Sequence, residues 1–260
     1  MEHFIATNKN LKTIAEATAF IQQVHTDGGN ILVLTGAGIS TESGIPDFRS
    51  PGTGLWERMN PMEVLSLSVL EEHPQQFYKT GFRLLMEMRS AEPNQAHLIL
   101  AKMEQEGVIQ GIITQNIDNL HHKAGSKRVW EVHGNTRDAH CTLCRRIFPI
   151  EELECCLEEG VIPPRCKKCG GILRPSVVLF GDPMPEVYQE AMAAVKKAEL
   201  LIIVGSSLSV YPVAYLPEVA KQCMIINLTP TEFDVRAKLV IHEKASTALL
   251  GIYGMLKNGQ

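Results

Sequence analysis

The sequence predicts an α/β fold, in which a parallel sheet carries helices on both faces and a smaller lobe is inserted into the chain. Short apolar runs that are typical of buried strands alternate with segments of helical periodicity along most of the sequence. This alternation is typical of parallel sheets covered by helices. A cysteine-rich stretch at residues 141–170 interrupts the alternation and carries little periodic signal, which indicates the smaller lobe.

The helices are indicated by apolar spacing and by the residues that begin or end them. The first ends before Gly28, after apolar residues at helical spacing: Leu11, Ile14, Ala17, Ile21 and Val24. Pro61 and Pro74 are typical of first helical turns and predict helices over about 61–70 and 74–89. Gly107 ends a helix over about 95–105. Further helices are expected over 185–197, after Pro212 and near 245–256.

The strands are indicated by short apolar runs. The run at 31–34 lies directly before Gly36 and is bounded by glycines on both sides, as expected of a buried strand. Similar runs predict strands at 108–114, 129–132, 177–180, 200–204 and 224–228. Strands and helices together therefore cover most of the 260 residues outside the cysteine-rich stretch.

Composition limits the classes of protein that the sequence fits. The 45% hydrophobic residues are typical of a globular protein, and the net charge of −4 gives no general attraction to nucleic acid. The densest apolar run, at 200–204, is far shorter than the ~20 residues that cross a bilayer. No signal peptide is recognised, so we expect a cytoplasmic protein without membrane association. Seven cysteines cannot all form disulfides, and disulfides are rare in the cytosol.

Two glycine-containing loops follow predicted strands. Gly36, Ala37 and Gly38 come directly after the first strand, an arrangement that lets backbone approach a phosphate. Thr41 stands where a third glycine is usual, so nucleotide binding and a purely structural turn both remain open. The loop Gly205-Ser206-Ser207 favours nucleotide binding, since two such loops can flank one ligand. Phe48 and Arg49 follow the first loop, and arginine can bind a pyrophosphate.

The cysteines form two pairs, each with two intervening residues: Cys141, Cys144, Cys166 and Cys169. This spacing predicts a tetrahedral site of four thiolates for one structural zinc ion. A redox pair or chance spacing is the alternative interpretation. Because protein ligands would fill all four positions, such a zinc would stabilise the lobe and take no part in chemistry. Cys155, Cys156 and Cys223 lie outside the pattern and are expected to be free thiols.

Polar side chains follow two further strands. Gln115, Asn116 and Asp118 come after the strand at 108–114, where a cluster of hydrogen-bonding groups indicates a binding site. His133 follows the strand at 129–132. Histidine is a candidate general base because its pKa lies near neutral pH, although a single histidine is more often structural. Its position beside other loops of this kind favours the catalytic interpretation.

These segments, in this order, resemble the sirtuin family of NAD-dependent protein-lysine deacylases. The resemblance rests on Gly36-Ala37-Gly38-Ile39-Ser40, Gly44-Ile45-Pro46-Asp47-Phe48-Arg49-Ser50, Thr114-Gln115-Asn116-Ile117-Asp118, His133-Gly134, the four cysteines and Gly205-Ser206-Ser207-Leu208. It covers about residues 31–245, and the short chain is similar to bacterial or archaeal members. It implies one catalytic unit over residues 1–260, with a Rossmann-like large lobe (1–51, 91–136 and 176–260) and a small lobe made of a helical insert (52–90) and a zinc ribbon (137–175).

The resemblance also implies the roles of individual residues. His133, Asn116 and Asp118 would be catalytic. NAD would be bound by Gly36, Ala37, Gly38, Thr41, Phe48, Arg49, Gln115, Ile117, Asp118, His133, Gly205, Ser206, Ser207, Asn227, Leu228, Lys244 and Ala245. The acyl-lysine peptide would lie against Val178, Phe180, Gly181 and Val210. Asp182 replaces the glutamate that is usual in the family, which would alter contacts at the edge of the substrate.

The implied activity consumes NAD and yields nicotinamide, O-acyl-ADP-ribose and free lysine. The family members that prefer acidic acyl groups carry a tyrosine and an arginine four residues apart, whereas Tyr78 and Arg83 are five apart, so neutral acyl chains are expected. An ADP-ribosyltransferase or NAD hydrolase on the same scaffold is the alternative. A non-enzymatic NAD-sensing or nucleic-acid-binding module and a dehydrogenase are more distant ones.

Overall fold

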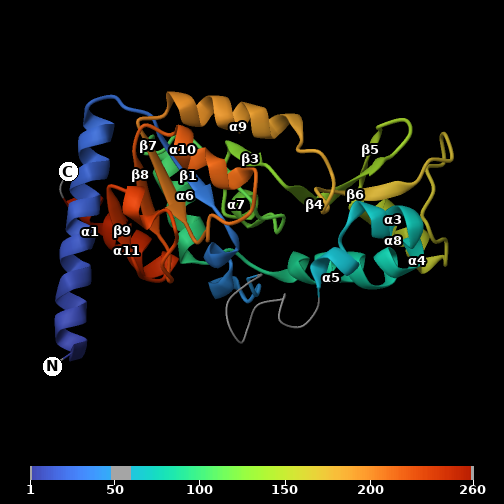
Figure 1. Ribbon diagram of the computed structural model, residues 1–260, viewed down its shortest axis with the longest axis horizontal. Helices are drawn as coiled ribbons and strands as arrows, with labels where there is room; N and C mark the ends of the chain where they lie inside the picture. Colours follow the sequence, from blue (N-terminus) through green and yellow to red (C-terminus); the bar gives the residue numbers. More distant parts are fainter. Residues whose placement is uncertain (1, 48–59, 259–260) are drawn as a thin grey trace.

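The chain forms two sheets, and the computed structural model describes residues 2–47 and 60–258 (Figure 1). The larger sheet is parallel throughout. Its strands in spatial order are β3 (Val129–Glu131), β2 (Ile112–Thr114), β1 (Ile31–Thr35), β7 (Leu200–Val204), β8 (Cys223–Ile226) and β9 (Leu239–Ile241). The chain runs outward from β1 to β3 and returns to start again at β7, beside β1. This reversal defines a doubly wound sheet, whose ligands bind at the carboxyl ends of the strands where the order reverses.

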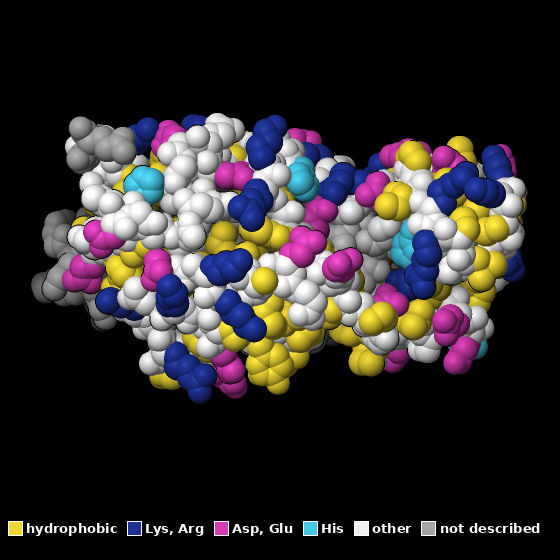
Figure 2. Space-filling model, turned by 90° about the horizontal axis from the view of Figure 1, so that it is seen from above, with side chains coloured by type: hydrophobic (Ala, Val, Ile, Leu, Met, Phe, Trp, Pro, Cys, Tyr) yellow, Lys and Arg dark blue, Asp and Glu magenta, His cyan; other side chains and the backbone are white. Residues whose placement is uncertain are grey.

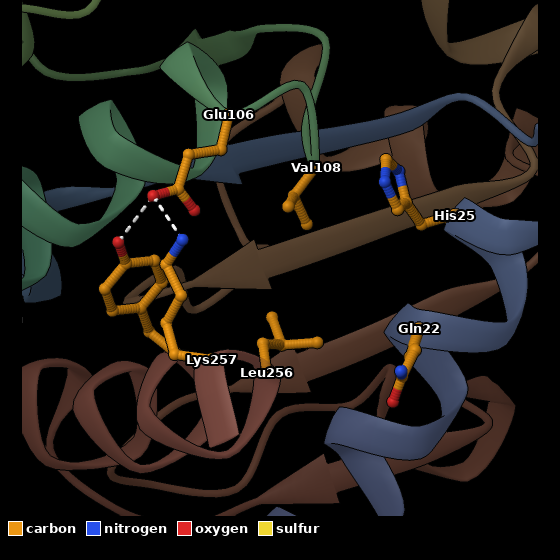
Figure 3. A pocket seen from close by; sticks show the side chains of 7 residues that line it. Gln22, His25, Glu106, Val108, Leu256 and Lys257 are labelled. Atoms are coloured by element: carbon orange, nitrogen blue, oxygen red, sulfur yellow. Dashed lines mark hydrogen bonds and ion pairs between the residues drawn. The ribbon is translucent and has the colours of Figure 1, made fainter. Parts of the chain in front are cut away.

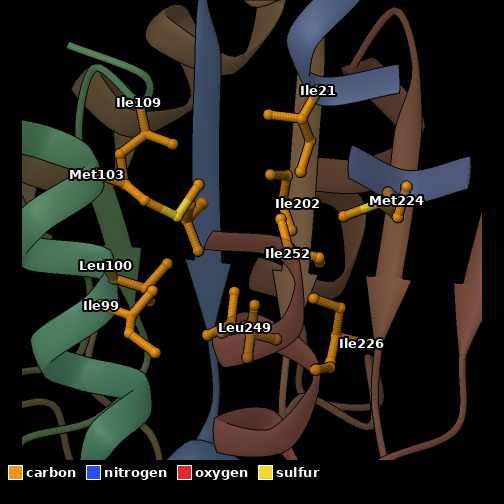
Figure 4. Packing of buried hydrophobic residues seen from close by; sticks show 14 of the residues in the cluster. Ile21, Ile99, Leu100, Met103, Ile109, Ile202, Met224, Ile226, Leu249 and Ile252 are labelled. Carbon is orange, nitrogen blue, oxygen red and sulfur yellow. The ribbon is translucent and has the colours of Figure 1, made fainter. Parts of the chain in front are cut away.

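Helices cover both faces of this sheet because successive strand residues point to opposite sides. Val33 and Ile202 face one layer, while Leu34 and Ile203 face the other. The first layer consists of α1 (Glu2–Thr26), α6 (Gln95–Gln105) and α11 (Ala245–Asn258), whose apolar side chains meet the strands in Figure 4. The second consists of α9 (Glu186–Lys197) and α10 (Leu216–Val219). The predicted fold class is confirmed.

The smaller sheet carries the cysteines. β4 (Gly134–Cys141) lies between β5 (Ile147–Pro149) and β6 (Leu173–Val177), both antiparallel to it, and α8 (Ile150–Glu158) follows β5. A helical segment packs against this sheet and consists of η3 (Pro61–Glu63), α3 (Leu67–Glu72), α4 (Pro74–Gln76), η4 (Phe77–Gly81), α5 (Phe82–Glu87) and η5 (Met88–Ser90). The Tyr78 hydroxyl donates to the Leu173 carbonyl at 2.6 Å, so the two parts share one core.

Short elements complete the chain. They are η1 (Ala37–Ile39), η2 (Thr41–Ser43), α7 (Leu120–Lys123), η6 (Val213–Tyr215) and η7 (Asp234–Arg236). Among the described residues, no helix combines the length and apolarity that crossing a bilayer requires. Figure 2 shows a larger and a smaller body joined by a narrower waist, and basic and acidic side chains alternate over the visible face.

The structure departs from the predicted elements at several places. The helix expected over 61–70 is divided, because the Ser66 hydroxyl accepts the Val69 N–H and begins α3 anew. The strand expected at 177–180 lies earlier, as β6, because its residues pair with β4. Beyond it, the Phe180 N–H turns to the Leu65 carbonyl. The strand expected at 108–114 is shortened to β2, and β4, β5, β9 and α8 were not predicted.

The close contact between the helical segment and the chain before α3 gives a stability prediction. A Cβ on Gly81 would lie 2.1 Å from the Val64 carbonyl oxygen, whereas a Cβ on Gly254 of α11 would meet nothing within 4 Å. Gly81→Ala should therefore lower the free energy of unfolding by about 1–3 kcal/mol. Gly254→Ala should raise it by about 0.5–1 kcal/mol through helix propensity. Urea unfolding of both variants checks this, and equal effects would contradict the packing described.

Candidate functional site

The two glycine loops interlock at the point where the strand order reverses. The Gly38 N–H donates to the Gly205 carbonyl at 2.8 Å. A Cβ on Gly36 or Gly38 would lie 2.8 Å from that carbonyl oxygen, and a Cβ on Gly205 would lie 2.3 Å from the Ile39 nitrogen. Gly205 also has a φ of +62°, which glycine adopts without strain. These glycines therefore bring the loop after β1 and the loop after β7 into direct contact.

A chain of hydrogen bonds links the loop after β2 to the loop after β1. The Asn116 amide donates to the Ser40 hydroxyl at 3.1 Å and to the Gly36 carbonyl at 3.1 Å. Ser40 in turn donates to the Asp118 carboxylate at 2.6 Å, and the Leu120 N–H donates to the same carboxylate at 2.9 Å. Asp118 is 4% exposed, and burial raises the pKa of its carboxyl group.

Two buried histidines lie against each other, with ring centroids 4.9 Å apart, and His97 is the one that reaches Ser40. His97 accepts the Asn94 N–H on Nδ1, so its Nε2 carries the proton and lies 3.5 Å from the Ser40 hydroxyl. His121 Nε2 lies 2.9 Å from the Thr35 hydroxyl. Burial lowers the pKa of His97 to about 4 and lowers the pKa of His121 well below its ordinary value. Both rings are therefore uncharged at neutral pH.

His133 is held in the tautomer that a general base requires. Its Nδ1 lies 3.0 Å from the Gln115 carbonyl oxygen, which can only accept a hydrogen bond. Nδ1 therefore carries the proton, and Nε2 keeps a free lone pair. Burial lowers the pKa of His133 below 6.5, so the neutral form prevails at neutral pH. The His133 carbonyl accepts the Val178 N–H at 2.9 Å, which joins this residue to the smaller sheet.

The other predicted NAD contacts fall into four groups. The Gln115 amide donates to the Ser206 hydroxyl at 2.9 Å and connects the loops after β2 and β7. Farther along the sheet edge, Asn227 and Leu228 follow β8, while Lys244 and Ala245 lie at the start of α11. Phe48 and Arg49 lie outside the described residues. The last group lies in loops already described. Thr41 is in the loop of Gly38, Ile117 follows Asn116, and Ser207 follows Ser206.

The segment that is predicted to contact the peptide, at Val178, Phe180 and Gly181, is held by main-chain hydrogen bonds to the helical segment. Phe180 donates its N–H to Leu65 and accepts the Leu67 N–H, and its side chain is exposed. Asp182 forms a two-bond ion pair with Arg174, at 2.9 and 2.5 Å, and accepts the Leu179 N–H. The carboxylate at position 182 therefore stabilises the turn at Gly181. Val178 and Val210 are partly buried.

The four paired cysteines converge at the end of the smaller sheet. Their sulfur atoms all lie within 4.8 Å of one another, with 3.4 Å between Cys141 and Cys169 and 3.9 Å between Cys144 and Cys166. A tetrahedron of thiolates around zinc, with bonds of about 2.3 Å, separates the sulfurs by about 3.8 Å. The residues present therefore fit one zinc ion.

The two cysteine turns repeat the same backbone pattern. The N–H four residues after the first cysteine donates to that cysteine's carbonyl, at Arg145 and at Gly170. Both of these residues have a left-handed backbone, with φ of +58° and +75°. A Cβ on Gly171 would lie 2.7 Å from the Cys141 sulfur, so glycine leaves room for the sulfur. All seven cysteines are free of disulfides, including Cys155, Cys156 and Cys223.

A separate pocket lies between α1, α6 and α11 and contains none of the predicted site residues (Figure 3). Glu106 accepts hydrogen bonds from Tyr253 and Lys257, both at 2.8 Å. Glu106, Tyr253 and Lys257 therefore satisfy one another in this pocket. A second, smaller hollow is lined by Asn116 and Asp118 together with Asn119 and Glu131.

Sequence reasoning missed Ser40, His97 and His121 as parts of the site. Ser40 was noted only as a residue of the glycine motif, yet its hydroxyl is hydrogen-bonded to both Asn116 and Asp118. His97 lies in an ordinary amphipathic helix, where nothing in the sequence marks its contact with a residue 57 positions away. His121 belongs to a pair of adjacent histidines, and nothing in the sequence marks its contact with Thr35, 86 positions away. The available signal was the Asn-x-x-His capping pattern, which placed the His97 ring near the loop.

Comparisons with known proteins point to one family. A family model described as the Sir2 family matches residues 36–212. The chain is 55% identical over 256 residues to "NAD-dependent protein deacetylase 2" of Caldanaerobacter subterraneus subsp. tengcongensis, covering 98% of this chain and 100% of that protein.

Solved structures give the same result. The chain is similar to Sir2 bound to a deacetylated p53 peptide and 3′-O-acetyl-ADP-ribose, with a TM-score of 0.81, 38% identity and coverage of 87% of this chain and 93% of that one. It is also similar to Sir2Tm bound to a propionylated peptide, with a TM-score of 0.77, 37% identity and coverage of 88% and 93%.

The thiolate cluster predicts the metal content of the protein. Elemental analysis of the purified chain should give one zinc per molecule. Cys144→Ser should lose most of the zinc, because three thiolates bind the ion more weakly than four. Cys155→Ser is the matched control, since Cys155 is an exposed thiol of α8 outside the cluster, and it should retain the metal. Full zinc content in the Cys144→Ser variant would contradict the assignment.

Proposed function

Because the chain belongs to the Sir2 family, we infer that it is an NAD-dependent protein-lysine deacylase, which forms nicotinamide, O-acyl-ADP-ribose and free lysine. One observation carries this function at the level of the site. The loops after β1 and β2 and the start of β4 bring Ser40, Asn116, Asp118 and His133 to one edge of the sheet, beside the smaller body. Acetylated and propionylated lysine peptides are the expected class of substrate.

The two bodies divide the work in this proposal. The large lobe consists of residues 1–51, 91–136 and 176–260 and binds NAD. The small lobe consists of the helical insert, 52–90, and the zinc ribbon, 137–175. The smaller body has a hydrophobic core of its own, which supports this division, and Ile117, Leu120 and Val177 of the large lobe pack into it where the lobes meet. The zinc ion stabilises the ribbon, because all four of its ligand positions are filled by thiolates.

The chemistry of the donor groups fits NAD. Gln115 and Ser206 offer an amide and a hydroxyl at the junction of the two glycine loops. Asn116 and Asp118 offer an amide oxygen and a carboxylate, which can accept the two N–H groups of a carboxamide, and Ile117 between them contributes apolar surface. Toward the adenosine end we place the weaker candidates: Asn227, Leu228, Lys244 and Ala245. The remaining proposed contacts are Gly36, Ala37, Gly38, Thr41, Phe48, Arg49, Gly205 and Ser207.

His133 is the proposed general base. NAD supplies the ribose that receives the acyl group and nicotinamide as the leaving group. The Nε2 atom of His133 takes a proton from a ribose hydroxyl, because Nδ1 is committed to the Gln115 carbonyl. The peptide is proposed to lie along Val178, Phe180, Gly181 and Val210, where main-chain contacts would tolerate varied sequences.

Neutral acyl chains are the proposed substrates of the reaction. A dicarboxylic acyl group needs a fixed basic partner. Tyr78, the tyrosine of the helical insert, is 2% exposed and donates its hydroxyl to the Leu173 carbonyl. It is therefore committed to the core of the small lobe. An ADP-ribosyltransferase on the same scaffold is not favoured, since the related structures contain deacylation products or acyl peptides.

We also propose that the protein works in the cytoplasm. Seven cysteines without a disulfide are typical of a reducing compartment.

Replacing the proposed base tests the mechanism. His133→Ala should lower kcat for deacylation of an acetylated peptide by about 10²- to 10⁴-fold, the usual contribution of a general base. Calorimetric titration should show that NAD still binds, because the ring is not needed to fold the loops. The matched control is His25→Ala, which removes an exposed histidine of α1 far from these loops. Near-normal kcat in the His133→Ala variant would show that another group takes the proton.

The tautomer and burial of His133 set the pH dependence. The neutral ring is active, so kcat should rise as pH rises through the pKa of His133 and then level off. Because burial lowers this pKa from 6.5, the midpoint of the rise should lie below pH 6.5. Steady-state rates at saturating NAD and peptide measure it. A midpoint above pH 7 would be incompatible with a buried neutral base.

A further inference from the structure

Three side chains from separate elements meet behind the Asp118 loop. Arg137 of β4 donates to both carboxylate oxygens of Glu131, at the end of β3, with distances of 2.7 and 2.6 Å. The same guanidinium donates to the Asn119 amide oxygen at 2.5 Å. Figure 1 shows β3, α7 and the start of β4 side by side where the two bodies meet. We call Arg137, Glu131 and Asn119 the clamp.

The pair inside the clamp is strong for its position. A guanidinium and a carboxylate that share two parallel hydrogen bonds hold a fixed geometry as well as a charge. The Glu131 side chain is 13% exposed and the Arg137 side chain is 35% exposed, so solvent screens the pair in part. His122 is the other basic group nearby, but its ring nitrogen lies 3.6 Å from Glu131, which is too far for a hydrogen bond.

The clamp acts on the residue that directly follows Asp118. Asn119 has a left-handed backbone, with φ of +68°, and turns the chain from the loop into α7. It precedes that helix, but its side chain does not cap the helix and binds Arg137 instead. On the other side of the turn, the Leu120 N–H donates to the Asp118 carboxylate. Fixing Asn119 therefore fixes the direction of Asp118.

The clamp also neutralises a charge close to Asp118. Glu131, Asn116 and Asp118 line the same small hollow. The negative charge of Glu131 contributes to the raised pKa of the Asp118 carboxyl group. Without Arg137, the buried carboxylate of Asp118 and the partly buried carboxylate of Glu131 would repel each other across this hollow, and the loop would relax to separate them.

We propose that Arg137, Glu131 and Asn119 are positioning residues, which hold the Asn116–Asp118 loop in the conformation that binds the nicotinamide end of NAD. This inference rests on the proposed function, because it assigns the loop to NAD. None of the three residues needs to touch the substrates. Arg137 lies in β4, between the base His133 and the first zinc ligand Cys141, so the clamp also ties the zinc-bearing sheet to the NAD loop.

Kinetics of Arg137→Met provide the test. The KM for NAD should rise by about ten- to a hundredfold, as expected for losing a charged hydrogen-bonded pair, while the KM for the acetylated peptide changes little. Arg137→Lys keeps the positive charge but cannot form two parallel hydrogen bonds to Glu131, so its KM for NAD should lie between those of the wild type and Arg137→Met. Glu131→Gln combined with Arg137→Met removes the repulsion, so its KM for NAD should also lie between these two.

Arg89→Met is the matched control. Arg89 likewise binds carboxylates, Glu151 and Glu154, and its side chain is 34% exposed, compared with 35% for Arg137. Its guanidinium joins the helical segment to α8, and its contact with α7 is made by its carbonyl, which accepts the Lys123 ammonium and is kept in the variant, so both KM values should stay unchanged. If Arg137→Met does not fold, Asn119→Gly is the alternative variant. Glycine keeps the left-handed backbone at this position and removes only the amide oxygen that accepts the Arg137 hydrogen bond. This variant should raise the KM for NAD selectively as well.

Direct titration of NAD by calorimetry separates this inference from the proposed function. If the wild-type chain binds NAD but does not deacylate peptides, the proposed function is wrong, while weaker NAD binding by Arg137→Met and Asn119→Gly still supports the clamp. If both variants bind NAD as tightly as the wild type, the clamp is overturned whatever the activity. A fall in kcat together with equal rises in the KM for NAD and the KM for the peptide, seen also in Arg89→Met, would show a merely structural role. That result would overturn the clamp as well.

Discussion

The contact between the two glycine loops is the constraint on which the site depends. Strand order reverses between β1 and β7, and the loops that follow these strands touch through the Gly38 N–H and the Gly205 carbonyl. A side chain on Gly36, Gly38 or Gly205 would collide with backbone of the opposite loop. Because of this close approach, the Ser40 hydroxyl accepts a hydrogen bond from Asn116 and donates one to Asp118. The close approach also brings the Ser206 hydroxyl within hydrogen-bond distance of the Gln115 amide.

The polar side chains of the site are arranged around this contact between the loops. Buried neutral histidines lie behind Ser40, the carboxylate of Asp118 lies beside it, and His133 turns Nε2 away from the Gln115 carbonyl. Each charged or titratable group is held by a backbone group or by a partner from another strand. Such preorganisation lets the site bind NAD without first ordering its own loops. The zinc-bearing sheet contributes through β4, which begins directly after His133.

Sequence reasoning predicted the fold class, most strands and the zinc cluster, because these depend on local periodicity and on spacing within the chain. It also predicted which loops form the site, since residues after strands gather at one edge of a parallel sheet. It could not predict the hydrogen-bond partners. Ser40 and Asp118 are separated by 78 positions, and nothing in the sequence connects Arg137 to Asn119, 18 positions away. Short elements such as β5 and β9 carry too few apolar residues to be recognised alone.

The central claim is that this edge of the sheet transfers an acyl group from lysine to the ribose of NAD. Mass spectrometry of a single reaction, with acetylated peptide and NAD supplied to the purified chain, tests it most directly. The account predicts equal amounts of deacetylated peptide, nicotinamide and O-acetyl-ADP-ribose throughout the time course. Release of free acetate with NAD left intact, or ADP-ribose attached to protein without loss of the acetyl group, would contradict it.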